Sequence, residues 1–153
     1  MATLDFTRTI AAPPETVFEV LSDHRGYGDV VSTIRRVELE REGDPAPDGV
    51  GAIRAIHAVG PPIREEVIAY DAPRRLGYRM LSGAPLKDHV GTVELTEEGN
   101  GTRMSWNLET TPTVPIGGSA LVKVVEQVIN QMIKGIAKES ERRSELDAPR
   151  RDS

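Results

Sequence analysis

Apolar residues recur at helical spacing near the end of the chain, and they form its longest regular pattern. From Ser119 to Arg143 they follow one another at intervals of three and four residues, which predicts one long amphipathic helix. The apolar stripe of this predicted helix consists of Leu121, Val124, Val125, Val128, Ile129, Met132 and Ile136. Such a stripe must be buried against another element, so the helix needs a large apolar partner.

Shorter alternating patterns fill most of the remaining chain and predict strands. Thr3–Ile10 alternates between apolar and polar residues as a half-buried strand does, and Pro13-Pro14 ends it and opens a short helix. The segment 23–29 is typical of a turn or a weak second helix, and further short strands follow between Ile34 and Thr111. The sequence therefore predicts an α+β fold in which one antiparallel sheet folds around the C-terminal helix, an arrangement that usually leaves a cavity.

The hairpins of this sheet can be put in register by matching their apolar faces, because a slip of one residue would turn a strand inside out. The pairs predicted across the first turn, at 71–73, are Val67 with Leu76, Glu65 with Tyr78 and Ile63 with Met80. The pairs predicted across the next two turns are Leu76 with Val93, Tyr78 with Gly91, Met80 with His89, Val93 with Trp106, Gly91 with Leu108 and Leu95 with Met104.

In this register three polar side chains, Glu65, Tyr78 and His89, face an apolar interior. A buried carboxylate without a partner costs on the order of several kcal/mol. Glu65 should therefore bond to Tyr78, meet an arginine or water, or take up a proton. Gly91, which lacks a side chain opposite Tyr78, should leave local space in the interior.

These residues admit a catalytic and a structural interpretation. Glu65 and Tyr78 can exchange protons as a general acid/base pair, with His89 steadying a substrate oxygen. Alternatively, Glu65 is a satisfied structural acid or a hydrogen-bond partner for a ligand, and His89 lies partly exposed near a hairpin end. Nearby methionine and aromatic side chains either line an apolar ligand site or pack as core. The residues expected to bind a ligand are Tyr27, Val31, Ile53, Glu65, Val67, Tyr78, Met80, His89, Gly91, Met104, Trp106, Val125, Val128 and Met132.

Composition narrows the class of protein. The 153 residues, of which 38% are hydrophobic and 28% charged, predict a single globular domain over 1–146 and a flexible polar tail over 147–153. The absence of cysteine excludes disulfides and thiol chemistry. A formal net charge of −5 argues against nucleic acid as a partner, because such binding needs clustered Lys and Arg.

Other signals predict a cytoplasmic protein without a metal or a cofactor. No apolar run approaches the ~18 residues of a membrane span, and 1–5 lacks the layout of a signal peptide. The three histidines are scattered along the chain, so we expect neither a metal nor a cofactor. An aromatic content of only 4% suits an aliphatic ligand, such as an acyl chain, better than a stacked polycyclic one.

Several motifs together resemble one known family. They are the strand and Pro-led helix of 10–18 with Leu21-Ser22-Asp23 and Tyr27, the glycine of Val50-Gly51, the strand, Pro-Arg-Arg turn and strand of 63–67 and 72–79, and the last turn and strand of 101–106. In these respects the chain resembles the START-like helix-grip proteins, also called SRPBCC, and especially their bacterial polyketide cyclase/dehydrase branch. The resemblance covers nearly the whole chain, but it marks turns and core positions rather than reacting groups.

The resemblance implies a sheet of about seven antiparallel strands around the C-terminal helix, with two short helices closing one end. Members of the family bind apolar or amphipathic small molecules. Some are aromatase/cyclases and others are carriers of lipids or hormones. The chain has Ile34 where the cyclases have a pocket tyrosine, and Val30-Val31 where many relatives have tryptophan. Both departures weigh against a cyclase.

Three functional hypotheses follow. The first is carriage or sensing of a small hydrophobic or amphipathic molecule, lipid-like or polyketide-like, in a cavity between the sheet and the C-terminal helix. The second is a cyclase or dehydratase in which Glu65 and Tyr78 are the acid/base pair. The third is a ligand-free interaction module, and the sequence leaves monomer and homodimer open.

Overall fold

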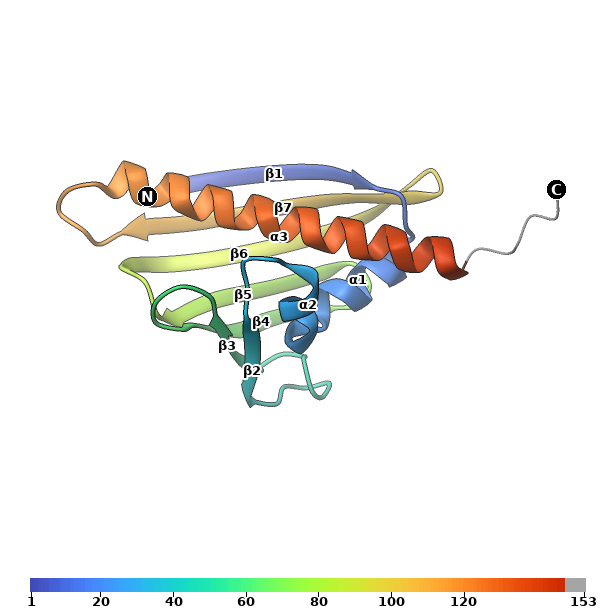
Figure 1. The fold of residues 1–153 in the computed structure, drawn as a ribbon, viewed down its shortest axis with the longest axis horizontal. Helices are drawn as coiled ribbons and strands as arrows, with labels where there is room; N and C mark the ends of the chain where they lie inside the picture. The colour runs from blue at the N-terminus through green and yellow to red at the C-terminus, as the bar shows by residue number, and fades with distance from the viewer. Residues whose placement is uncertain (148–153) are drawn as a thin grey trace.

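The computed structural model describes residues 1–147, and this part of the chain forms one antiparallel sheet and a long C-terminal helix (Figure 1). The strands are β1 (Ala2–Ile10), β2 (Arg36–Arg41), β3 (Ile53–His57), β4 (Ile63–Asp71), β5 (Arg75–Ser82), β6 (Leu86–Glu98) and β7 (Gly101–Pro112). The helices are α1 (Pro14–Ser22), the 3₁₀ turn η1 (His24–Gly26), α2 (Tyr27–Val30) and α3 (Gly118–Asp147). The seven strands lie in the order β1-β7-β6-β5-β4-β3-β2, which confirms the predicted α+β fold.

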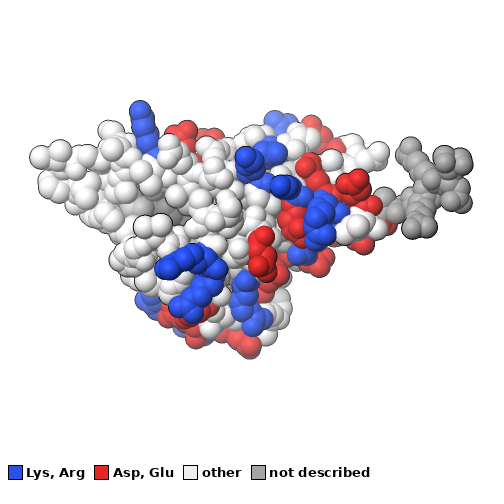
Figure 2. All heavy atoms as spheres, in the orientation of Figure 1, with Lys and Arg blue, Asp and Glu red and all other residues white. Residues whose placement is uncertain are grey.

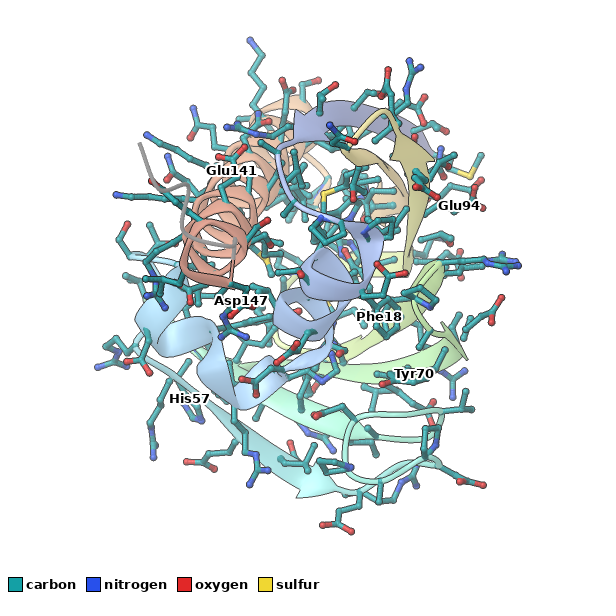
Figure 3. All side chains as sticks on the ribbon, turned by 90° about the vertical axis from the view of Figure 1, so that its right-hand side faces the viewer. Phe18, His57, Tyr70, Glu94, Glu141 and Asp147 are labelled. Carbon is teal, nitrogen blue, oxygen red and sulfur yellow. The ribbon has the colours of Figure 1, made fainter. Side chains whose placement is uncertain are left out.

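The sheet curves around α3, which lies along one of its faces from end to end (Figure 1). Figure 3 looks from the end of the molecule that carries α1. In this view α1 lies between α3 and β4, the strand that carries Tyr70. At this end Phe18 of α1 meets Tyr70 of β4 edge to face, with ring centroids 5.1 Å apart. The two short helices thus close one end of the space between sheet and helix, as the helix-grip prediction requires.

The long helix spans the predicted segment and extends beyond it at both ends. Its C-terminal half carries the fully buried side chains of Ile136, Ala137 and Ser140. Gly135 brings α2 close to this half, since a Cβ atom there would lie 2.5 Å from the Val30 carbonyl oxygen. None of the helices in the described part of the chain is long and apolar enough to cross a membrane. Of the tail predicted over 147–153, Asp147 ends α3 and the rest lies outside the described residues.

The predicted register is confirmed for the two hairpins made by β5, β6 and β7. The confirmed pairs are Leu76 with Val93, Tyr78 with Gly91, Val93 with Trp106, Gly91 with Leu108 and Leu95 with Met104. The prediction for Met80 with His89 falls beyond the last pair of the β5–β6 ladder, Arg79 with Val90. These three strands therefore present their expected faces to α3.

The predicted register between β4 and β5 is wrong. Val67 pairs with Tyr78 rather than with Leu76, and Glu65 pairs with Met80 rather than with Tyr78. The cause is the position of the turn, because Asp71 already pairs with Arg75 and residues 72–74 connect the strands, which shifts the pairing by three residues. A bulge between Val67 and Ala69, which places an extra residue in β4, then reduces this shift to two. Because the error at Val67 amounts to two residues, the predicted inward faces are preserved, and both Glu65 and Val67 are buried.

Candidate ligand-binding site

A cavity of about 460 Å³ lies between the sheet and the first half of α3. Its walls come from β3 to β7, from the loops that follow α2, β3 and β5, and from one side of α3. Eight residues that the sequence predicts as ligand contacts line it: Glu65, Tyr78, Met80, His89, Trp106, Val125, Val128 and Met132. The wall contributed by α3 is entirely apolar, whereas the polar side chains come from the sheet and, with Thr33, from the loop after α2.

A buried ion pair forms part of the cavity wall. Arg54 of β3 and Glu65 of β4 are direct partners across the two strands, and both side chains are almost wholly buried. Nη2 and Nε of Arg54 donate to the same carboxylate oxygen, Glu65 Oε1, at 2.8 and 3.2 Å. The third nitrogen, Nη1, is buried and has no hydrogen-bond partner among the described residues. Of the partners expected for Glu65, the one present is an arginine, Arg54.

Tyr78 lies beside this ion pair. The Arg54 guanidinium carbon is 5.2 Å from the centroid of the Tyr78 ring, an arrangement that favours a cation–π contact. The Tyr78 hydroxyl accepts a hydrogen bond from Trp106 Nε1 at 3.2 Å. The ring lies over Gly91, and any Cβ atom at that position would overlap its Cζ and Cε1 atoms. The space that Gly91 was expected to leave is thus occupied by Tyr78 itself.

His89 stands on the next strand and completes the polar wall. It is buried, in contrast to the partial exposure expected near a hairpin end. Its Nδ1 shares a hydrogen bond of 2.9 Å with the hydroxyl of Thr110, which is also buried. This bond fixes the ring and leaves Nε2 without a partner among the described residues, so that Nε2 remains available to a ligand.

Burial is the main cause of the pKa shifts of Tyr78 and His89, and attraction by Glu65 contributes to that of Arg54. It raises the pKa of the Tyr78 phenol far above its ordinary value, and the Glu65 carboxylate raises it further. Burial also lowers the pKa of His89, against the opposing effect of Glu65. For Arg54, burial alone would lower the pKa, but attraction by Glu65 and neighbouring groups raises it. At neutral pH the wall therefore holds a protonated Tyr78, an uncharged His89 and a positively charged Arg54.

The mouth of the cavity is apolar and exposed, whereas its inner wall is polar and buried. Val59, in the β3–β4 loop, is 99% exposed and Val124 of α3 is 53% exposed, and both line the cavity. In contrast, Arg54 is 2% and Tyr78 3% exposed. Figure 2 shows that the surface over the N-terminal part of α3 and the neighbouring loops is largely free of charged side chains. A hollow opens in this uncharged surface (Figure 2).

The remaining six predicted contacts lie away from the cavity wall. Tyr27, Val31, Val67 and Met104 are core residues, each no more than 1% exposed. The Tyr27 hydroxyl donates to the Leu21 carbonyl oxygen, so it is satisfied within the end formed by the short helices. Gly91 supports Tyr78 from behind, and Ile53 is a half-buried residue at the start of β3. None of these six residues lines the cavity.

Arg54 is the central residue of the wall that the sequence analysis missed. It lies between Ile53 and Ala55 in a short apolar strand, where an arginine is easily taken for a solvent-facing residue. The signal that could have found it is Glu65. Burying a carboxylate calls for a cation, and a cross-strand neighbour on β3 is the nearest source of one.

The other two histidines lie outside the cavity. His24 is fully buried, with Nδ1 3.2 Å from Asp48 Oδ1, and burial lowers its pKa to about 4. His57 approaches Glu38, at 3.6 Å between Nε2 and Oε1. Among the described residues, no group of three or more His, Asp or Glu side chains is arranged to hold a metal ion.

A curved antiparallel sheet gripping a C-terminal helix around a cavity defines a START-like helix-grip protein. Residues 1–141 match the family described as polyketide cyclase/dehydrase and lipid transport, and the chain belongs to this family. Comparison with curated proteins finds no match.

Solved structures with the same fold cover nearly the whole chain. A START superfamily protein from Mycobacterium smegmatis has a TM-score of 0.75 at 15% identity, and the match covers 95% of this chain and 99% of that one. Zhui aromatase/cyclase from Streptomyces sp. R1128 has a TM-score of 0.73 at 23% identity, covering 93% and 94%. The protein TTHA0849 from Thermus thermophilus has a TM-score of 0.67 at 25% identity, covering 97% and 100%. The fold is therefore shared, and the chemistry of each relative remains its own.

Proposed function

We propose that this protein binds a small hydrophobic or amphipathic molecule in the cavity between the sheet and α3, in order to carry or sense it. The observation that carries the proposal is the cavity itself, whose 460 Å³ fall within the range of about 300 to 1,000 Å³ typical of ligand pockets. At roughly 30 Å³ for each water molecule, the same space would hold about 15 waters.

The distribution of side chains supports an elongated ligand with one polar end. Val125, Val128 and Met132 of α3 offer aliphatic contacts along one side. Tyr78 and His89 offer hydrogen bonds on the opposite, buried wall. Methionine and aliphatic side chains adapt to ligands of irregular shape, which fits the low aromatic content of the chain.

An acid/base role for Glu65 and Tyr78 has weaker support. Arg54 engages Glu65 through two hydrogen bonds, and the Tyr78 hydroxyl interacts with Trp106. No hydrogen bond links Glu65 and Tyr78 within the part of the chain that the structure describes. A general base should be free to take a proton from substrate, whereas this carboxylate holds a guanidinium. A ligand-free interaction module, in turn, has no need of a cavity of this size.

The first experiment is native mass spectrometry of the protein purified from its own cell extract, followed by release and identification of any bound molecule. We expect a stoichiometric hydrophobic or amphipathic species. Val125→Trp should abolish this adduct, because Val125 lines the cavity and a tryptophan would fill it. Val122→Trp is the matched control, since Val122 is half-buried on the same helix but does not line the cavity. Bare protein that also fails to take up any member of a lipid panel would contradict the proposal.

A further inference from the structure

The polar wall of the cavity carries a balanced pair of charges, and this balance restricts what can bind there. Arg54 contributes one positive charge, and the Glu65 carboxylate that accepts its two hydrogen bonds compensates it. A charged ligand would add an unpaired charge to a site removed from water, which is costly unless a partner neutralises it. A second carboxylate would also lie near that of Glu65, and like charges repel.

The hydrogen-bonding capacity left in the wall includes both an acceptor and a donor. Glu65 accepts from Arg54 through Oε1 only, so Oε2 can still accept from a ligand. The Tyr78 oxygen accepts from Trp106, but its own proton is donated to no described residue. Because Arg54 contacts both Glu65 and the Tyr78 ring, these two groups are neighbours in the wall. A ligand hydroxyl matches them, since it donates one hydrogen bond and accepts another.

Arg54 itself is closed to an anionic ligand. Two of its nitrogens are committed to Glu65, and the third, Nη1, is buried with almost no accessible surface. A ligand carboxylate would therefore have to displace Glu65 before it could pair with the guanidinium. Displacement would leave the carboxylate of Glu65 without a cation, so the site would still hold one unpaired negative charge.

We infer that the ligand is an uncharged amphiphile, an alcohol or phenol with an aliphatic body, whose hydroxyl lies between Glu65 and Tyr78 and whose apolar end points to the mouth near Val124. This inference rests on the proposed function and specifies the chemical class of its ligand. It departs from the acyl chain expected from composition, because a free fatty acid ends in an ionised carboxylate at neutral pH.

The test compares three ligands of equal chain length at neutral pH: 1-decanol, decanoate and protonated decylamine. Binding is measured by titration calorimetry and by the emission of Trp106, which is the single tryptophan of the chain and lines the cavity. We expect 1-decanol to bind at least about tenfold more tightly than either charged ligand, because only the alcohol leaves the buried charges balanced. Decanoate or decylamine binding as tightly as 1-decanol would overturn the inference and leave the proposed function standing. Failure of all three to bind would contradict the proposed function itself.

A variant of the ion pair should reverse the preference. Glu65→Gln leaves the charge of Arg54 uncompensated, so decanoate should then bind more tightly than 1-decanol. Glu66→Gln is the matched control, because the neighbouring Glu66 pairs with Arg41 and Arg79 outside the cavity, and it should keep the preference of the unmodified protein. If Glu65→Gln does not fold, the double variant Arg54→Met/Glu65→Met, whose wall is again neutral, should still prefer the alcohol. A double variant that favours decanoate would count against the inference.

Discussion

Gly91→Ala tests whether the lack of a side chain at Gly91 allows the Tyr78 ring to take its place in the polar wall of the cavity. The added Cβ would overlap Cζ, Cε1 and the hydroxyl oxygen of Tyr78, so the ring has to leave its place. Moving the ring also breaks the hydrogen bond from Trp106 Nε1 to the Tyr78 hydroxyl. The change is therefore small in the sequence and large at the site.

The expected cost follows from these two effects. Overpacking of a buried site costs about 1–3 kcal/mol, and loss of one buried hydrogen bond costs about 1 kcal/mol more. We expect Gly91→Ala to lower the free energy of unfolding by about 2–4 kcal/mol. Gly77→Ala on β5 is the matched control, since its nearest contact would be Ala69 Cβ at 3.1 Å, which requires only a slight adjustment. It should change stability by less than about 1 kcal/mol.

The free energy of unfolding of both variants is measured by urea denaturation. Far-ultraviolet circular dichroism and Trp106 fluorescence monitor the unfolding. The fluorescence of the folded state should change in Gly91→Ala, because Trp106 loses its partner, and should remain unchanged in Gly77→Ala. The decisive comparison is a double-mutant cycle with Tyr78→Ala. Without the ring, Gly91→Ala should cost less than about 0.5 kcal/mol. An equal cost with and without the Tyr78 ring would refute the explanation.

Two further predictions concern buried ionisable side chains. Arg54→Met should lower the free energy of unfolding by about 3–5 kcal/mol because it leaves Glu65 buried without a cation, and Arg54→Met/Glu65→Met should recover most of this loss in urea denaturation. A double variant as unstable as Arg54→Met would show that packing, rather than charge, dominates there. Burial lowers the pKa of His24 from 6.5 to about 4, so the unfolded chain takes up the proton first and stability falls as the pH drops through this interval. At about pH 5 the loss should be about 2 kcal/mol relative to neutral pH, and His24→Gln should remove most of it; an unchanged pH profile in that variant would contradict the assignment.

The features that the sequence predicted well depend on repeated local patterns. The apolar stripe of α3 has seven members at helical spacing, and the β6 and β7 strands are long enough to allow only one match of their apolar faces. The same procedure failed between β4 and β5 because it placed the turn at 71–73, whereas Asp71 still pairs with Arg75 and residues 72–74 connect the strands. The bulge after Val67 changes the pairing by one further residue, and no property of Ile68 itself distinguishes a bulged residue from a paired one.

The site was predicted in part, for a physical reason. Glu65, Tyr78 and His89 stand out because polar residues at inward positions are unusual, and the structure brings all three into one wall. Arg54 does not stand out, because its role depends on the cross-strand pairing of β3 with β4, which the hairpin matching did not include. Met80 and Trp106 line the cavity whereas Tyr27 and Met104 do not, and a sequence pattern does not contain that difference.

The two halves of α3 tolerate sequence change differently. Side chains of the C-terminal half, such as Ile136 and Ala137, are locked into the core, so most substitutions there would harm folding. In the N-terminal half, Val124 and Val128 line the cavity yet remain about half exposed, so their replacement costs the fold little. Evolution, or a designer, can therefore change which molecule the helix accepts at one end while the other end keeps the protein folded.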